Sequence, residues 1–259
     1  MHHQRQSHPP AARSSPGAAR AGAERGLRRR MRVTEGFSAE LASAATLGRV
    51  DEDLAEGMRR LWTRLGPAAA RQPAEGYRAL VARLKVARPS TYVHSVRTAR
   101  YSKIIGRALG FDAARLRQLG ATAMLHDVGK LLVPEFILSR PRRPSRVERF
   151  VLRLHPRLGE LLAARHGLSP ELRVRTAHHH ERWDGRGYPH GVGGEDIPLL
   201  ARVVQIADSF DAMVSRRGYN SPRSDAEALA ELRREAGTQF DPRLVEAFLD
   251  SYKGVSQKS

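Results

Sequence analysis

Apolar residues recur along most of the chain at the three- and four-residue intervals that place them on one face of a helix. The clearest early stripe ends at Gly66-Pro67 and consists of Leu54, Met58, Leu61, Trp62 and Leu65. Further stripes follow within residues 77–84 and 112–124, whereas no segment alternates apolar and polar residues between hairpin turns. The pattern predicts an all-α fold, a bundle of roughly eight to ten helices.

Residues that favour helix ends mark several boundaries of this predicted bundle. Candidate N-terminal caps are Ser90 or Thr91, Asp112, Ser145, Ser169 and Ser224. Gly110 is expected to end the helix that carries His94. Residues 185–194 contain five Gly and one Pro, which predicts an ordered loop between two helices.

Composition narrows the class of protein. The 259 residues carry a net charge of +18, a field that favours polyanionic partners such as nucleotides, nucleic acid or acidic lipid. The absence of Cys excludes disulfides and thiol nucleophiles and agrees with a cytoplasmic location. No apolar run is long enough for a membrane span, and no helix-turn-helix signature indicates specific binding of nucleic acid.

Histidines and carboxylates are concentrated in the second half of the chain. His126-Asp127 ends an apolar stripe, His179-His180 precedes the Gly-rich loop, and Asp208 lies inside an apolar run. Taken singly, each is as readily a core or surface residue, and a buried Asp can be held by an Arg. Taken together, imidazoles and carboxylates from different helices suit a site for two metal ions.

Four motifs follow one another in the order HDVGK (126–130), HPRLG (155–159), HHERWDGRGYP (179–189) and IADSFDAM (206–213). In this order and spacing they resemble the HD-GYP domain, a metal-dependent branch of the HD phosphohydrolase superfamily. The resemblance covers about residues 90–250. It implies a helical metal centre, often of iron or manganese, that hydrolyses cyclic di-GMP to pGpG and in some members on to GMP.

Matched position by position, the resemblance implies seven metal ligands, namely His94, His126, Asp127, His155, His179, His180 and Asp208. Asp127 corresponds to the carboxylate that bridges two cations, and the water between them would supply the attacking hydroxide. The implied catalytic residues are therefore Asp127 and Lys130. Lys130 also counts among the implied substrate contacts, together with Tyr188, Arg186 and Arg217.

Other polar residues near the motifs are expected to support the site without binding metal. Glu181 and Asp184 are expected to orient the histidine rings, and Arg202 is a further candidate for a phosphate contact. The simpler alternatives are a surface salt bridge for Lys130 and a loop anchor for Tyr188. The remaining histidines of this half have no motif position and are expected to be structural, namely His166, His178 and His190.

Two departures from the family pattern matter. Members with a third metal carry a Glu one turn before the first His, where this chain has Ser90, so two divalent cations per chain are expected. The substrate-binding segment reads RRGYN at 216–220 and lacks a second basic contact at Asn220. This departure leaves the nucleotide preference open.

The chain divides into a disordered basic tail at residues 1–33, a helical extension at 34–88 and the HD-GYP catalytic domain at 89–253. A start at Met31 is an alternative. The extension is expected to pack onto the bundle, with a helical adaptor or dimerisation element as the alternative. The sequence leaves open a homodimer or a signalling partner protein.

Two other functions compete with cyclic di-GMP hydrolysis. One is an HD-type phosphohydrolase that acts on another nucleotide, which the Asn220 departure motivates. The other is a sensor or adaptor that binds cyclic di-GMP without hydrolysing it. The intact set of implied ligands argues for an enzyme.

Overall fold

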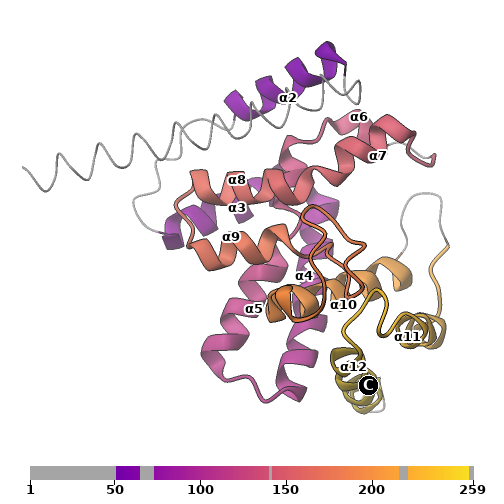
Figure 1. Ribbon diagram of the computed structural model, residues 1–259. Helices are drawn as coiled ribbons and strands as arrows, with labels where there is room; N and C mark the ends of the chain where they lie inside the picture. Colours follow the sequence, from indigo (N-terminus) through magenta and orange to yellow (C-terminus); the bar gives the residue numbers. More distant parts are fainter. Residues whose placement is uncertain (1–50, 65–72, 140–141, 216–220, 257–259) are drawn as a thin grey trace, which may run out of the picture.

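The computed structural model describes residues 51–64, 73–139, 142–215 and 221–256, and there the predicted all-α class is confirmed. The elements are α2 (Glu52–Arg64), α3 (Pro73–Ala87), α4 (Pro89–Ala108), α5 (Ala113–Leu125), η1 (Val128–Leu132), α6 (Glu135–Leu138), α7 (Arg146–Arg153), α8 (His155–Arg165), α9 (Pro170–Ala177), η2 (Gly194–Asp196), α10 (Leu199–Val214), α11 (Asp225–Arg234) and α12 (Pro242–Ser256). Figure 1 shows their arrangement. The tail predicted at 1–33 lies outside the described residues.

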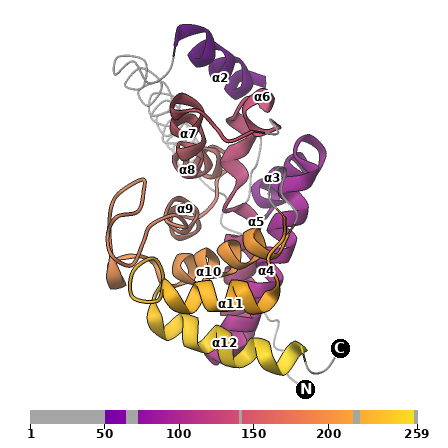
Figure 2. The same ribbon diagram turned by 90° about the vertical axis from the view of Figure 1, so that its right-hand side faces the viewer.

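The buried apolar side chains form two hydrophobic clusters. The N-terminal cluster gathers α2, α3, the end of α5, η1 and α6 to α8, with Leu84 and Leu158 fully buried in it. The C-terminal cluster gathers α4, α5 and α10 to α12, with the rings of Phe210 and Phe248 5.1 Å apart. In Figure 2, α10, α11 and α12 are layered at one end, and α7 and α8 lie toward the other. Full burial of one such side chain contributes about 1.5–3 kcal/mol.

Helix α5 runs from one cluster to the other. Its Leu119 and Ala123 belong to the C-terminal cluster, whereas Leu125 belongs to the N-terminal cluster. The helix therefore ends between the two clusters, and His126 and Asp127 follow immediately. This course places the HD pair in the interior, at the junction of the two halves.

Most of the predicted helix caps are present. Ser145 and Ser224 each form a complete capping box, and the side chains of Asp112 and Ser169 accept from backbone N–H groups of α5 and α9. At the predicted stop, Gly110 adopts a φ of 69°, a left-handed conformation that glycine adopts with little strain.

The cap predicted at Ser90 or Thr91 is wrong. Helix α4 begins at Pro89, which already has the φ that the first helical position needs, and Arg88 precedes it without a side-chain cap. The Arg88 guanidinium instead donates to the carbonyl oxygens of Lys130 and Val133. Arg88 therefore joins the start of α4 to η1.

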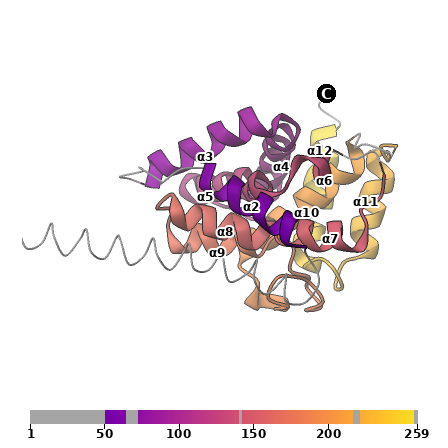
Figure 3. The same cartoon turned by 90° about the horizontal axis from the view of Figure 1, so that it is seen from above.

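The two N-terminal helices pack onto the rest of the bundle. Met58 and Trp62 of α2 and Leu80 of α3 are buried in the N-terminal cluster. The Arg165 guanidinium of α8 lies 4.4 Å from the centre of the Trp62 ring. Seen from above, α2 crosses the top of the molecule, and the loop between α9 and α10 projects to one side (Figure 3).

Candidate metal centre

Five segments bring the seven predicted ligands together at the junction of the two clusters. His94 lies on α4, His126 and Asp127 follow α5, His155 begins α8, His179 and His180 follow α9, and Asp208 lies on α10. The HD pair can approach α8 because η1 carries Gly129. A Cβ at that position would lie 1.9 Å from the carbonyl oxygen of His155, so only glycine allows this contact.

Asp127 lies at the middle of the group. Its Oδ2 is 3.4 Å from Nε2 of His126 and 3.7 Å from Nε2 of His94, while its Oδ1 is 3.2 Å from Nε2 of His155. Oδ1 of Asp208 lies 2.9 Å from Nε2 of His94 and 3.8 Å from Nε2 of His126. The two oxygens of Asp127 therefore face different imidazoles.

The ligand atoms form two adjacent groups. Within each group, one candidate ligand atom from every residue lies within 4.8 Å of the others; the groups are His155, His179, His180 and His94, His126, Asp127. We call them the histidine group and the mixed group. Each is compact enough to hold one cation, and the carboxylate of Asp127 lies between them.

Backbone carbonyls orient three of the imidazoles. Nδ1 of His126, His155 and His179 each donates to a carbonyl oxygen three residues earlier, at 2.7, 2.6 and 2.7 Å. Because a carbonyl can only accept, each neutral ring carries its proton on Nδ1 and presents a lone pair on Nε2. The rings are thereby prepared as metal ligands.

The free Nε2 atoms fit a cation. Nε2 of His126 is buried and has no hydrogen-bond partner among the described residues. The Nε2 atoms of His155 and His179 lie 3.0 Å apart, although both rings carry their proton on the opposite side. Two lone pairs at that distance repel each other unless a proton or a cation lies between them. Imidazole nitrogens with a carboxylate suit iron, manganese or zinc.

Burial sets the charge state of the histidine group. It lowers the pKa of His155 from 6.5 to about 3 and holds the pKa values of His179 and His180 well below 6.5. Neutral imidazole is the form that binds metal. Burial alone would raise the pKa of Asp127, but Lys130 and the surrounding histidines hold it well below its usual range. The site thus presents an ionised carboxylate among neutral rings.

His94 is held differently, by a carboxylate that the sequence analysis missed. Its Nδ1 lies 2.6 Å from Asp211, whose other oxygen accepts from Arg97 at 2.5 Å. Burial would lower the pKa of His94, but hydrogen bonds with Asp208 and Asp211 raise it. Burial would raise the pKa of Asp211, but hydrogen bonds from His94 and Arg97 lower it to about 2. A carboxylate behind a ligating histidine orients the ring and strengthens it as a donor.

Lys130 lies at the edge of the centre. Its Nζ donates to Oδ2 of Asp127 at 2.6 Å, and 22% of its side chain is exposed. An ammonium group in this position can contact an anion that approaches the centre from solvent.

Glu181 and Asp184 do not orient histidine rings, contrary to expectation. Glu181 is fully buried, and its carboxylate accepts from the backbone N–H groups of His190 at 2.6 Å and Gly191 at 3.1 Å. Asp184 accepts from the Arg182 side chain and from the backbone of residue 186. Both carboxylates therefore order the loop, because its glycines leave backbone donors that need partners.

Tyr188 lies against the centre. Its ring stacks on His180, with the ring centroids 4.9 Å apart and the planes inclined by 23°. The exposed Arg153 at the end of α7 covers the Tyr188 ring, its guanidinium carbon 4.4 Å from the ring centre. Burial raises the pKa of the Tyr188 hydroxyl, which stays protonated. The loop thus brings the Tyr188 ring to the rim of the centre, where Arg153 of α7 covers it. The sequence analysis missed Arg153.

The other predicted anion contacts have three different outcomes. Arg186 is exposed on the loop. Arg217 lies outside the described residues. Arg202 as a phosphate contact is wrong, because its buried guanidinium forms an ion pair with Asp241 at 2.6 Å. That pair joins α10 to the start of α12.

The three histidines without a motif position stay outside the ligand groups. His166 is buried, and its Nδ1 donates to the carbonyl oxygen of Leu162 at 3.0 Å. The rings of His178 and His190 stack with their centroids 4.5 Å apart. None of the three belongs to either compact group of candidate ligands in the described part of the chain.

Comparison with known proteins agrees with this geometry. Residues 79–244 match the HD domain family. The chain is 39% identical over 155 residues to the cyclic di-GMP phosphodiesterase response regulator RpfG of Xanthomonas campestris pv. campestris, covering 59% of this chain and 41% of that protein. It is 34% identical over 164 residues to 3'3'-cGAMP-specific phosphodiesterase 2 of Vibrio cholerae, covering 62% and 31%. The chain thus spans less than half the length of each of these relatives.

The solved structures show the same fold. Bd1817, an HDG"Y"P protein from Bdellovibrio bacteriovorus, superposes with a TM-score of 0.55 at 17% identity, covering 77% of this chain and 70% of that one.

Among the described residues, no helix is both long and apolar enough to cross a membrane. With the HD pair at the junction and the GYP loop beside it, the chain belongs to the HD domain family, as its resemblance to the HD-GYP branch predicted.

Proposed function

We propose that this chain is a metal-dependent phosphodiesterase that hydrolyses cyclic di-GMP to the linear dinucleotide pGpG. The observation that carries the proposal is the pair of Nε2 atoms of His155 and His179, 3.0 Å apart and both without a proton of their own. Such a pair is stable around a cation. The names of the two relatives, phosphodiesterases of cyclic di-GMP and of 3'3'-cGAMP, support a cyclic dinucleotide as the substrate.

We propose two divalent cations, iron or manganese, one for the histidine group and one for the mixed group. Asp127 supports this number because its two oxygens face different groups. Ser90, exposed near the start of α4, supplies no carboxylate for a third. Bound cations of this kind lower the pKa of a coordinated water molecule and polarise phosphoryl oxygens.

The protein's own residues would hold and orient the substrate. Lys130, 2.6 Å from Asp127, would contact the scissile phosphate and offset the charge that develops on it. The Tyr188 ring stacks on His180, and a guanine base would displace Arg153 from that ring. Arg186 and Arg217 are proposed as further phosphate contacts. Depressed pKa values keep the histidine group neutral and free to bind metal.

Product analysis on metal-loaded protein tests the proposal. The chain would be loaded anaerobically with Fe(II) or Mn(II) and incubated with cyclic di-GMP, 3'3'-cGAMP, cyclic di-AMP and a phosphate monoester. The expected result is pGpG from cyclic di-GMP, and no turnover after chelation. Faster cleavage of another nucleotide would reassign the substrate. If the chain binds two metals and cyclic di-GMP but leaves the nucleotide uncleaved, it acts as a sensor and not as an enzyme.

A further inference from the structure

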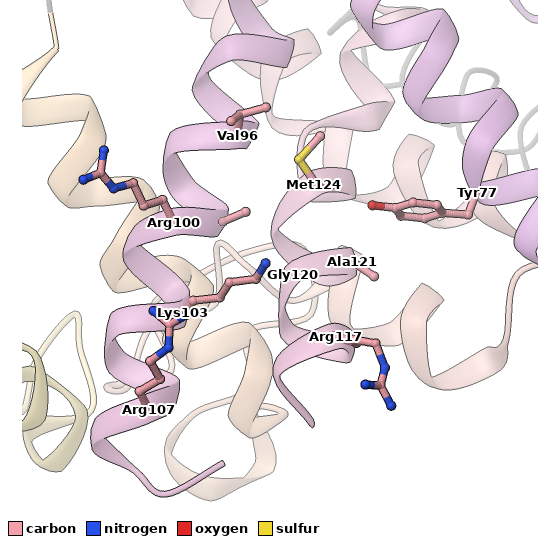
Figure 4. Close-up of a pocket in the computed structure, with 10 residues that line it drawn as sticks. Tyr77, Val96, Arg100, Lys103, Arg107, Arg117, Gly120, Ala121 and Met124 are labelled. Carbon is pink, nitrogen blue, oxygen red and sulfur yellow. The ribbon is translucent and has the colours of Figure 1, made fainter. Parts of the chain in front are cut away.

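A cavity lies on the side of α4 that faces away from the metal centre. Its volume is about 560 Å³, and it opens between α4 and α5 with Tyr77 of α3 at its edge (Figure 4). On α4 it is lined by Val96, Ala99, Arg100, Lys103 and Arg107, which by the helical repeat lie about 140–240° around the axis from His94. The cavity is therefore separate from the metal centre, although both are built on α4.

The lining of this cavity carries four cations and no carboxylate. Arg100, Lys103 and Arg107 come from α4, and Arg117 comes from α5. In the part of the chain that the structure describes, no salt bridge joins any of the four to an acidic group. Arg97, one turn away, is by contrast held by Asp211. Concentrated positive charge in a concave surface attracts anions and is relieved when one binds.

The floor of the cavity is apolar. Met124, Ala121 and Ala99 line it, and the Tyr77 ring closes one side (Figure 4). The Lys103 side chain lies over Gly120 in the middle of α5, where a Cβ would come 3.1 Å from Cε of that lysine.

We propose that this cavity binds a phosphorylated organic anion of the nucleotide class, at a site distinct from the metal centre. The cations would bind the phosphate, and the apolar floor with the Tyr77 ring would accept a base. A volume of about 560 Å³ lies within the range of small-molecule pockets. The cavity is open to solvent, and its apolar floor beside the cations fits a small molecule that carries both a phosphate and a base. The occupant would touch α4 and α5, the helices that lead to His94 and His126.

Methionine methyl NMR tests this site directly, because Met124 lines the cavity. The full chain labelled with ¹³C-methyl methionine would be titrated with GMP, AMP, inorganic phosphate and phosphatidylglycerol vesicles. Met124→Leu assigns the resonance. The K103Q/R107Q double variant removes two cavity charges, and the R233Q/R234Q double variant removes two exposed arginine charges on α11 as the matched control. Thermal melts confirm that each variant folds.

A nucleotide should shift the Met124 methyl resonance saturably, and K103Q/R107Q should weaken this binding at least tenfold while R233Q/R234Q leaves it unchanged. Inorganic phosphate should bind at least tenfold more weakly than a nucleotide, since it lacks the base. A Met124 resonance that stays fixed, or that moves equally in K103Q/R107Q, would overturn the proposal. So would equal affinity for inorganic phosphate, or a response to vesicles alone. The readout needs no hydrolysis, so it stands apart from the test of the phosphodiesterase.

Discussion

The two groups of the candidate metal centre differ in what holds their imidazole rings and in what sets their charge. In the histidine group, backbone carbonyls fix His155 and His179, and burial keeps the rings neutral. In the mixed group, Asp208 and Asp211 flank His94, and their hydrogen bonds raise its pKa. The first half lacks negative charge of its own, whereas the second is already compensated by carboxylates. Asp127 is the residue that both halves share.

This difference indicates which of the two groups depends more on a bound cation for its structure. Without one, the mixed group can place a proton on His94 between two carboxylates. The histidine group has no comparable substitute, because its facing Nε2 lone pairs repel each other and burial disfavours a charged ring. We therefore expect the structure of the histidine group to depend more on metal than that of the mixed group.

Replacing the shared carboxylate should have the largest effect. In Asp127→Ala, both halves lose a ligand, so we expect loss of metal and a fall in turnover of cyclic di-GMP of about a thousandfold or more. Metal content by elemental analysis and pGpG by chromatography measure this. Asp250→Ala, which removes an exposed carboxylate on α12, is the matched control and should behave as wild type. Normal turnover in Asp127→Ala would refute the metal mechanism.

Asp211→Asn should weaken one half only. The variant loses the charge that fixes the His94 ring, and such a change behind a ligating histidine costs about 10–100-fold in metal affinity. One cation should dissociate earlier in a chelator titration while the other stays bound. Asp250→Asn is the control. Equal weakening of both cations would show that the two groups are not independent.

These sites illustrate what the sequence could and could not predict. The family resemblance implied seven ligands, and the fold brings these side chains together because α5 ends where its two clusters meet. Asp211 was missed although a signal existed, since it lies three residues after Asp208 on an apolar helix and so shares its face. Arg153 gave no signal, because an exposed arginine at the end of α7 resembles many others in this chain. Its role depends on the course of a distant loop.

The roles of Glu181 and Arg202 show a second limit of sequence reasoning. Both were placed near the ligands by proximity in the sequence. Glu181 instead binds the backbone of the loop, and Arg202 pairs with Asp241, 39 residues away. Buried charges must find partners, and those partners are set by tertiary packing.

Acid should destabilise the metal-free protein. The histidine group has pKa values below the 6.5 of an unfolded chain, so between pH 6.5 and about 3 the unfolded state binds more protons. His155, with a pKa of about 3, removes about 1.4 kcal/mol of stability per pH unit over that window, and His179 and His180 act in the same direction. His94, whose pKa is raised, adds little to this slope, because below pH 6.5 it is protonated in both the folded and the unfolded state. Urea unfolding of chelated protein should therefore show stability falling from pH 6.5 to 5, and His155→Gln should reduce the slope by about one proton. Stability that rises with acid would contradict the neutral assignment.

The smallest effect is expected at the rim. Tyr188→Ala removes the ring that stacks on His180, and we expect KM for cyclic di-GMP to rise about tenfold, the order of one lost base–aromatic stack. Tyr188→Phe keeps the ring and should stay within about twofold, because stacking rather than the hydroxyl is the proposed contact. Steady-state kinetics separates the two. A larger loss in Tyr188→Phe would assign a role to the hydroxyl.

Anomalous diffraction from crystals of the manganese- or iron-loaded chain tests the central claim most directly. The account predicts two peaks, one among His155, His179 and His180 and one among His94, His126 and Asp208, with Asp127 between them. A single peak, or metal bound elsewhere while these side chains keep their present contacts, would contradict it.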